Sequence, residues 1–153
     1  MRILEVDSAI DRCREHLQCC GSQKEHIEAY LTQYLLVLIY ANFEKKIKEI
    51  ITDKLACTCN MLVKSYIEPS VDDAIKKISM EELKKFVARR FGKPHRDKIK
   101  KDSSLTLQVE IYYGNIINNR HMTSHGSGSS MTFLDLVNFY EEAHKVLDAL
   151  SNI

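Results

Sequence analysis

The segment IEAYLTQYLLVLIYANFEKKIKEIITDKLA, residues 27–56, contains neither proline nor glycine. Such a run is typical of one long helix, because proline and glycine are the residues that most often end helices. Just before it, Ser22 and Glu25 have the spacing of a capping box, which predicts where the helix begins. Between Tyr34 and Phe43 the segment is apolar on every side. This predicts a central, buried helix around which the rest of the molecule packs.

The other segments of the chain also have the pattern of helices. Residues 1–17 carry apolar side chains at loosely helical spacing, and Gly21 ends that element. Further along, we expect Pro69, Gly92 and Pro94 to end helices, because each interrupts a helical pattern. No segment shows the apolar and polar alternation of a strand, so the chain is expected to be all-helical.

Serines mark two further helix starts. Ser70 and Ser79 each precede acidic residues, as expected at helix N-termini. Two last helices are expected over about 105–125 and 132–150, on either side of a short Gly/Ser segment. We therefore expect an all-α bundle of about five helices, forming a single domain over residues 1–153.

The charge balance excludes a strongly basic surface. The 153 residues carry a net charge of +1 and 44% hydrophobic residues, which is typical of a globular protein. Any contact with nucleic acid has to come from a local patch. No segment approaches the roughly eighteen uncharged residues of a membrane span, and the first turn already carries charges, so we expect a cytoplasmic protein that does not contact a membrane.

The cysteine spacings do not match a metal site. The five cysteines are Cys13, Cys19, Cys20, Cys57 and Cys59, and no pair has the CxxC spacing of zinc or redox motifs. We expect reduced thiols and no metal. A zinc site from Cys57, Cys59 and a distant histidine is the alternative that this spacing does not favour.

One dense basic run lies between Arg89 and Lys101, RRFGKPHRDKIKK. It has two interpretations. It is either a solvated connection between helices, since charged loops are common, or a surface that holds RNA phosphates without reading sequence. Its candidate phosphate-binding residues are Arg96, Lys98, Lys100 and Lys101.

An arginine breaks the apolar pattern of the helix predicted over residues 105–125. With about 100° per residue, the apolar side chains of this helix centre close to Arg120, where a leucine or isoleucine would be expected. His121 and His125 lie one turn apart along one edge of the same stripe. Such breaks concentrate at functional sites. Alternatively, the helix ends here, with Gly126 as its cap and basic residues that favour the negative end of the helix dipole.

The stretch NNRHMTSHG, residues 118–126, resembles the R-x4-H signature of the HEPN superfamily, in the form where a polar residue follows the arginine. Gly126 matches the glycine that often comes next in that family. Serine stands at 124 where the family often has alanine. The context is also similar, with YANFEKKIKEII on an early buried helix and a helix after the motif. The resemblance spans about residues 30–150, but the section from 71 to 101 has no matching signature.

The resemblance implies an RNA-cleaving helical domain that uses no metal and acts as a homodimer, with two motifs meeting across a cleft. By the same resemblance, His125 is the general acid/base and Arg120 binds the scissile phosphate. These residue types suit the chemistry, since histidine exchanges protons near neutral pH and arginine stays charged. His121 is expected to orient His125 or to bind phosphate. Ser124 and Asn119 are weaker candidates for contacts with the substrate.

Glu44, in the sequence Asn42-Phe43-Glu44, is a second candidate for the site. A buried acid needs a partner, and an arginine from the R-x4-H helix would provide one. Alternatively, Glu44 begins the exposed half of its helix, because glutamates are seldom buried. Asn42 is a similar but weaker candidate.

Two functions remain open from the sequence. The first is a metal-independent endoribonuclease of the toxin or defence type, restrained by a separately encoded antitoxin or sensor. The second is a HEPN-like scaffold that binds RNA or protein without cutting. The presence of both Arg120 and His125 favours the first.

Overall fold

The computed structural model describes residues 1–21, 24–56, 61–75, 77–124 and 131–153, and their regular structure is entirely helical. The helices are α1 (Leu4–Cys19), α2 (Lys24–Ala56), α3 (Met61–Ala74), α4 (Met80–Arg90), α5 (Lys93–Lys101), α6 (Leu107–Ser124), α7 (Phe133–Ala143) and α8 (Lys145–Ser151). The all-α prediction is therefore confirmed, but the number of helices exceeds the expected five. The prediction treated residues 132–150 as one helix, which a turn at His144 divides into α7 and α8.

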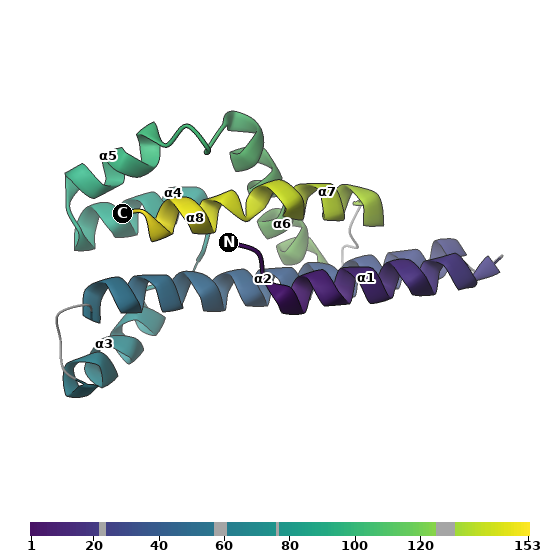
Figure 1. The fold of residues 1–153 in the computed structure, drawn as a ribbon, viewed down its shortest axis with the longest axis horizontal. Helices are drawn as coiled ribbons and strands as arrows, with labels where there is room; N and C mark the ends of the chain where they lie inside the picture. The colour runs from purple at the N-terminus through teal and green to yellow at the C-terminus, as the bar shows by residue number, and fades with distance from the viewer. Residues whose placement is uncertain (22–23, 57–60, 76, 125–130) are drawn as a thin grey trace.

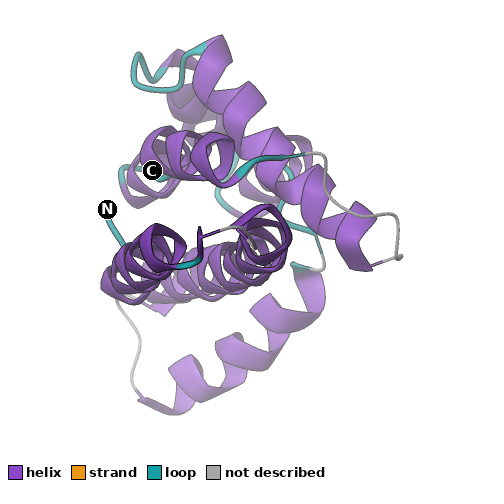
Figure 2. Ribbon diagram, turned by 90° about the vertical axis from the view of Figure 1, so that its right-hand side faces the viewer, coloured by secondary structure: helices purple, strands orange, loops and turns teal. Residues whose placement is uncertain are grey.

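The long helix α2 organises the fold. Figure 1 shows α1 and α2 side by side and antiparallel, with α7 and α8 above them, and α2 packs on α6, α7 and α8. Viewed from the side in Figure 2, the α1–α2 pair forms one layer and α6 to α8 a second layer above it. Helix α3 packs on α2, and α4 packs on α5. The motif helix α6 is thus held between α2 and α7.

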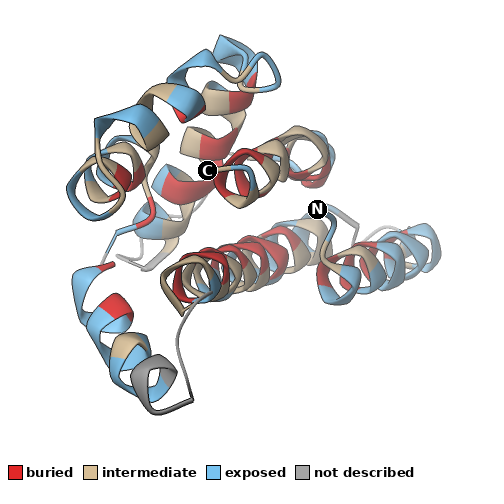
Figure 3. Cartoon of the chain, turned by 60° about the vertical axis from the view of Figure 1, so that its left-hand side comes forward, coloured by how far each residue is buried: buried red, intermediate tan, exposed pale blue. Residues whose placement is uncertain are grey.

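Aromatic side chains from three helices meet at the centre of the core. Phe43 of α2 stacks on Tyr113 of α6 and on Tyr140 of α7, with ring centroids 5.8 and 6.1 Å apart. All three rings are buried, and the hydroxyl of Tyr113 donates to the carbonyl of Ile78. Figure 3 shows buried residues along the facing sides of the two layers. Burial of rings this large fixes the position of α6 against α2.

The prediction that α2 is buried on every side between Tyr34 and Phe43 is wrong for one face. Tyr30, Tyr34 and Val37 are 73%, 54% and 49% exposed and lie one helical turn apart. The C-terminal half of α2 is covered on its outer side by α3, where Lys48 pairs with Asp72 at 3.1 Å. Among the described residues, no helix gives such cover to the outer face of its N-terminal half.

The prediction that Pro69 ends a helix is wrong, whereas the predicted end of α4 before Gly92 and Pro94 is confirmed. Helix α3 continues through Pro69 and Ser70, and the burial of Val71 in the turn that follows helps to offset the lost backbone hydrogen bond. Pro94 lies in the first turn of α5, where its missing N–H costs nothing. Gly92 does end α4, with the positive φ of 90° that favours glycine.

The other predicted boundaries are close to those observed. The hydroxyl of Ser79 accepts from the backbone N–H of Glu82 at 3.4 Å and caps α4 as expected. The predicted cap at Ser22 lies outside the described residues. Cys13, Cys19 and Cys20 are free thiols, whereas Cys57 and Cys59 lie outside the described residues. Across the described ranges, none of the helices has the length and apolar character to cross a membrane.

Candidate nucleic-acid interface and catalytic site

The apolar stripe of α6 is placed as its sequence predicts. Val109, Tyr113, Ile116 and Ile117 are buried, and Arg120 follows them on the same side as a half-buried residue. The arginine therefore interrupts a core-facing stripe close to the end of the helix, one position before the exposed His121. A half-buried cation in this position needs a compensating partner.

That partner is an aromatic ring from α2. The Cζ atom of Arg120 lies 4.5 Å from the ring centroid of Tyr40, within the range of a cation–π interaction. The ring of His121 meets the same tyrosine edge-on, with centroids 6.2 Å apart. Tyr40 itself is buried, with 7% of its surface exposed. The first two residues of the motif are thus gathered around one ring at the junction of α2 and α6.

Glu44 does not provide the partner that the sequence suggested. Its carboxylate accepts from the Lys48 ammonium at 2.9 Å, and Lys48 also reaches Asp72 at 3.1 Å. The side chain of Glu44 keeps 35% of its surface exposed, so it needs no buried cation. The expected ion pair with Arg120 is not formed, and Arg120 has no ion pair with any described residue. Glu44 itself is therefore partly exposed, but the half of α2 that follows it is not the exposed half of the helix, since Ile47, Ile50 and Ile51 are buried.

The electrostatic surroundings keep Tyr40 protonated. Burial raises the pKa of the Tyr40 hydroxyl above its ordinary value, and the nearby charge of Glu44 raises this pKa further. Arg120 and Lys48 lower it, but their effect is smaller. The ring that faces Arg120 is therefore a neutral phenol at physiological pH.

The remaining predicted polar residues have separate positions. Asn119 donates from its side chain to the carbonyl of Asn115 at 2.9 Å, and Asn42 donates to the carbonyl of Leu38 at 3.0 Å. These bonds stay within one helix and do not join the two asparagines to Arg120. Ser124 is the last residue of α6, and its side chain lies outside the described part. His125 and Gly126 also lie outside the described residues.

A family model described as RiboL-PSP-HEPN matches residues 7–153 of this chain. The chain belongs to the HEPN family. The match covers nearly the whole sequence, including both helices that meet at Arg120. No curated protein and no solved structure matches the chain.

In this HEPN protein the basic run lies on helices and not in a loop. Arg89 and Arg90 end α4, and the residues from Lys93 to Lys101 form α5. The guanidinium of Arg96 donates to Asp97 at 2.9 Å, which partly neutralises it. The loop after α5 leads into the start of α6, and Arg120 lies thirteen residues further along, roughly 20 Å at 1.5 Å per residue. Figure 1 shows α5 beside α4, whereas α6 ends near the start of α7.

Tyr40 is the functional candidate that the sequence did not reveal. It lies in a run where nearly every residue is apolar, so neither periodicity nor charge distinguishes it. The contact becomes visible only when α6 is packed against α2. Together, Arg120 and Tyr40 present a permanent cation held by a neutral ring, a combination that suits binding of a phosphate.

Proposed function

We propose that this HEPN protein is a metal-independent endoribonuclease that cleaves RNA by attack of the 2′-hydroxyl on the adjacent phosphate. The observation that carries this proposal is the position of Arg120. Its guanidinium is half-buried, lies on the Tyr40 ring and has no acidic partner among the described residues. An arginine that is desolvated without a carboxylate keeps its hydrogen-bond donors for an external anion.

In this proposal histidine transfers protons and arginine stabilises negative charge. A histidine takes the proton from the 2′-hydroxyl, whose oxygen then forms a bond to phosphorus. The bond from phosphorus to the 5′-oxygen breaks, and a protonated histidine supplies the proton that the leaving oxygen needs. The products are a 2′,3′-cyclic phosphate and a 5′-hydroxyl. We assign the proton transfers to His125 and stabilisation of the charged transition state to Arg120, with His121 as an orienting or phosphate-binding residue.

A homodimer belongs to the same proposal. The exposed stripe of Tyr30, Tyr34 and Val37 lies on α2, the helix that supplies Tyr40, and Met122 on α6 is also 47% exposed. No charged residue occurs between Ala29 and Phe43. An uncharged apolar stripe suits a self-complementary protein contact better than it suits RNA, which needs cations. Pairing of two chains here would enclose two motifs in one cleft.

Membership of the HEPN family supports an RNA-related role. We extend the proposal to a toxin or defence protein that a separately encoded antitoxin or sensor restrains. An enzyme that cuts cellular RNA without a cofactor needs such a restraint, because nothing in its own chemistry limits it.

The test is cleavage of total RNA, followed by analysis of the product ends. The wild type should cut in the presence of EDTA and leave 2′,3′-cyclic phosphates. Arg120→Ala and His125→Ala should each reduce cleavage by about 10²-fold or more, because a positioned acid/base and a charged clamp each contribute on that order. His121→Ala should have a smaller effect.

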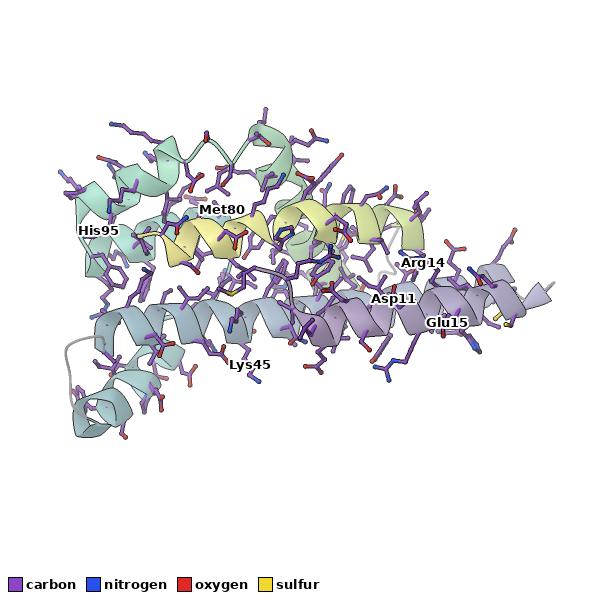
Figure 4. All side chains as sticks on the ribbon, in the orientation of Figure 1. Asp11, Arg14, Glu15, Lys45, Met80 and His95 are labelled. Carbon is purple, nitrogen blue, oxygen red and sulfur yellow. The ribbon has the colours of Figure 1, made fainter. Side chains whose placement is uncertain are left out.

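Matched controls are available on α1. Arg14, labelled in Figure 4, is exposed and pairs with Asp11 at 2.9 Å, and His16 on the same helix is also exposed. Arg14→Ala and His16→Ala should cut like the wild type. Robust cutting by His125→Ala, or cutting that EDTA abolishes, would contradict the mechanism. A wild type that cuts no RNA would favour the scaffold function.

A further inference from the structure

The geometry around Tyr40 assigns it a role that neither the motif nor the family match provides. We propose that Tyr40 is the positioning residue of the site, and that its ring holds the Arg120 guanidinium in the orientation in which it binds the scissile phosphate. This inference rests on the proposed endoribonuclease function.

The first support is the nature of the contact. Arginines near active sites are often oriented by carboxylates, which occupy some of the guanidinium donors. Here the contact is with a ring face at 4.5 Å, and the nearest acid on α2, Glu44, is engaged by Lys48. An aromatic face attracts the cation without accepting its in-plane N–H bonds. Orientation is therefore obtained while the donors stay available to phosphate.

The second support is the rigidity of Tyr40. It is buried and lies one turn from Leu36 and three residues from Phe43, both fully buried in the core. A side chain embedded at the centre of a long helix has little rotational freedom. Arg120, by contrast, is a long and flexible side chain near the end of α6. The ring thus restricts the motion of a residue that would otherwise sample many rotamers.

The third support is that His121 meets the same ring at 6.2 Å, edge-on. Arg120 and His121 are consecutive residues and point in different directions from a helix. Contact of both with one ring fixes the rotation of the last turns of α6 relative to α2. A change of this ring should therefore alter the orientation of the motif without removing any of its charged groups.

The experiment compares Tyr40→Phe and Tyr40→Leu with the wild type. Tyr40→Phe keeps the ring face and should cut RNA within about threefold of the wild type. Tyr40→Leu should lower kcat by about ten- to a hundredfold, with a smaller change in KM, because a displaced clamp loses transition-state contacts. In an Arg120→Ala background, Tyr40→Leu should cause little further loss, since the residue through which it acts is already absent.

A matched control separates positioning from packing. Tyr112 on α6 is half-buried and lies against the ring of Phe139 on α7, with ring centroids 4.5 Å apart, whereas Tyr40 is buried. Tyr112→Leu should remove an aromatic contact between α6 and α7 and leave kcat nearly unchanged below the unfolding temperature.

A spectroscopic measurement tests the contact without cleavage. The NMR resonances of the Arg120 side-chain protons should show a ring-current shift in the wild type and in Tyr40→Phe, and lose it in Tyr40→Leu. A wild type that shows no such shift would overturn the inference, as would a wild type and a Tyr40→Leu variant that cut equally well. A wild type that shows the shift but cuts no RNA would instead refute the proposed function, and the positioning role with it.

Discussion

At the scale of single residues, Arg120 and Glu44 differ in what balances their charge. Glu44 and Lys48 are one turn apart on α2 and form an ordinary ion pair at 2.9 Å, which raises the pKa of Lys48. Arg120 is balanced by the Tyr40 ring alone among the described residues. The proposed function therefore assigns the phosphate contact to Arg120, which has no carboxylate partner among the described residues, and assigns none to Glu44.

This difference leads to a prediction for Glu44→Gln. The substitution should change the free energy of unfolding by less than about 1 kcal/mol, because a partly exposed pair contributes little. Cleavage should stay within a few-fold of the wild type. Urea unfolding and RNA cleavage together check this. A loss of cleavage as large as that of Arg120→Ala would instead show that Glu44 takes part in the site.

At the scale of helices, the sequence predicts α6 better than it predicts the surroundings of α6. The stripe of Val109, Tyr113 and Ile116 follows helical spacing, so the position of Arg120 beside the core could be found on a helical wheel. The contact of Tyr40 with Arg120 could not be found in this way, because it depends on how α2 and α6 pack. The sequence also does not predict the exposed face of α2. An apolar helix face has the same residue pattern whether the same chain or another chain covers it.

The exposed stripe of α2 leads to a prediction about assembly. Val37→Asp should convert the proposed dimer to a monomer of 17.7 kDa in sedimentation at micromolar concentration, because a charge would be buried without a partner. Leu4→Asp is the control, since Leu4 is 83% exposed on α1 and should leave the dimer intact. A wild type that sediments as a monomer would contradict the prediction.

The contact between α7 and the N-terminal segment leads to a prediction about how stability depends on pH. Tyr140 is buried, and its hydroxyl accepts from the N–H of Ile3 at 3.2 Å. Burial raises the pKa of Tyr140 to about 12. The unfolded chain loses this proton near pH 10, so the stabilisation is full below about pH 10 and is lost as the pH rises towards 12.

We therefore expect the free energy of unfolding to fall between about pH 10 and 12. Tyr140→Phe should make this decline shallower, by up to about 1.4 kcal/mol per pH unit for one proton. Urea denaturation at several pH values measures both slopes. Equal slopes for the wild type and the variant would show that Tyr140 titrates alike in both states.

At the scale of the whole molecule, the basic residues lie on α4 and α5, whereas Arg120 lies on α6. The sequence indicates both features but not how far apart they lie. The Gly-Lys-Pro stretch predicts a loop, whereas Pro94 lies in the first turn of α5. Since α5 packs on α4 and Arg120 lies near the end of α6, we expect the basic helix and Arg120 to contact different phosphates. They could bind different parts of one long RNA, either within one chain or across a dimer.

This arrangement leads to a prediction about salt dependence. Replacing Arg96, Lys98, Lys100 and Lys101 together by glutamine should weaken RNA binding for all sequences. The slope of log Kd against log salt should fall by about 2, since each lost phosphate contact contributes about 0.7 for single strands and Arg96 is already paired with Asp97. An unchanged slope would mean that α5 is a solvated surface helix.

The central claim is that the protein cuts RNA through the 2′-hydroxyl next to the scissile phosphate. The most direct measurement uses an RNA oligonucleotide in which only that hydroxyl, at a mapped cleavage site, is replaced by hydrogen. We predict that the wild type stops cutting at this site, still cuts the unmodified oligonucleotide with EDTA present, and leaves a 2′,3′-cyclic phosphate there. Continued cutting at the deoxy position would contradict the claim, because the proposed nucleophile would be absent.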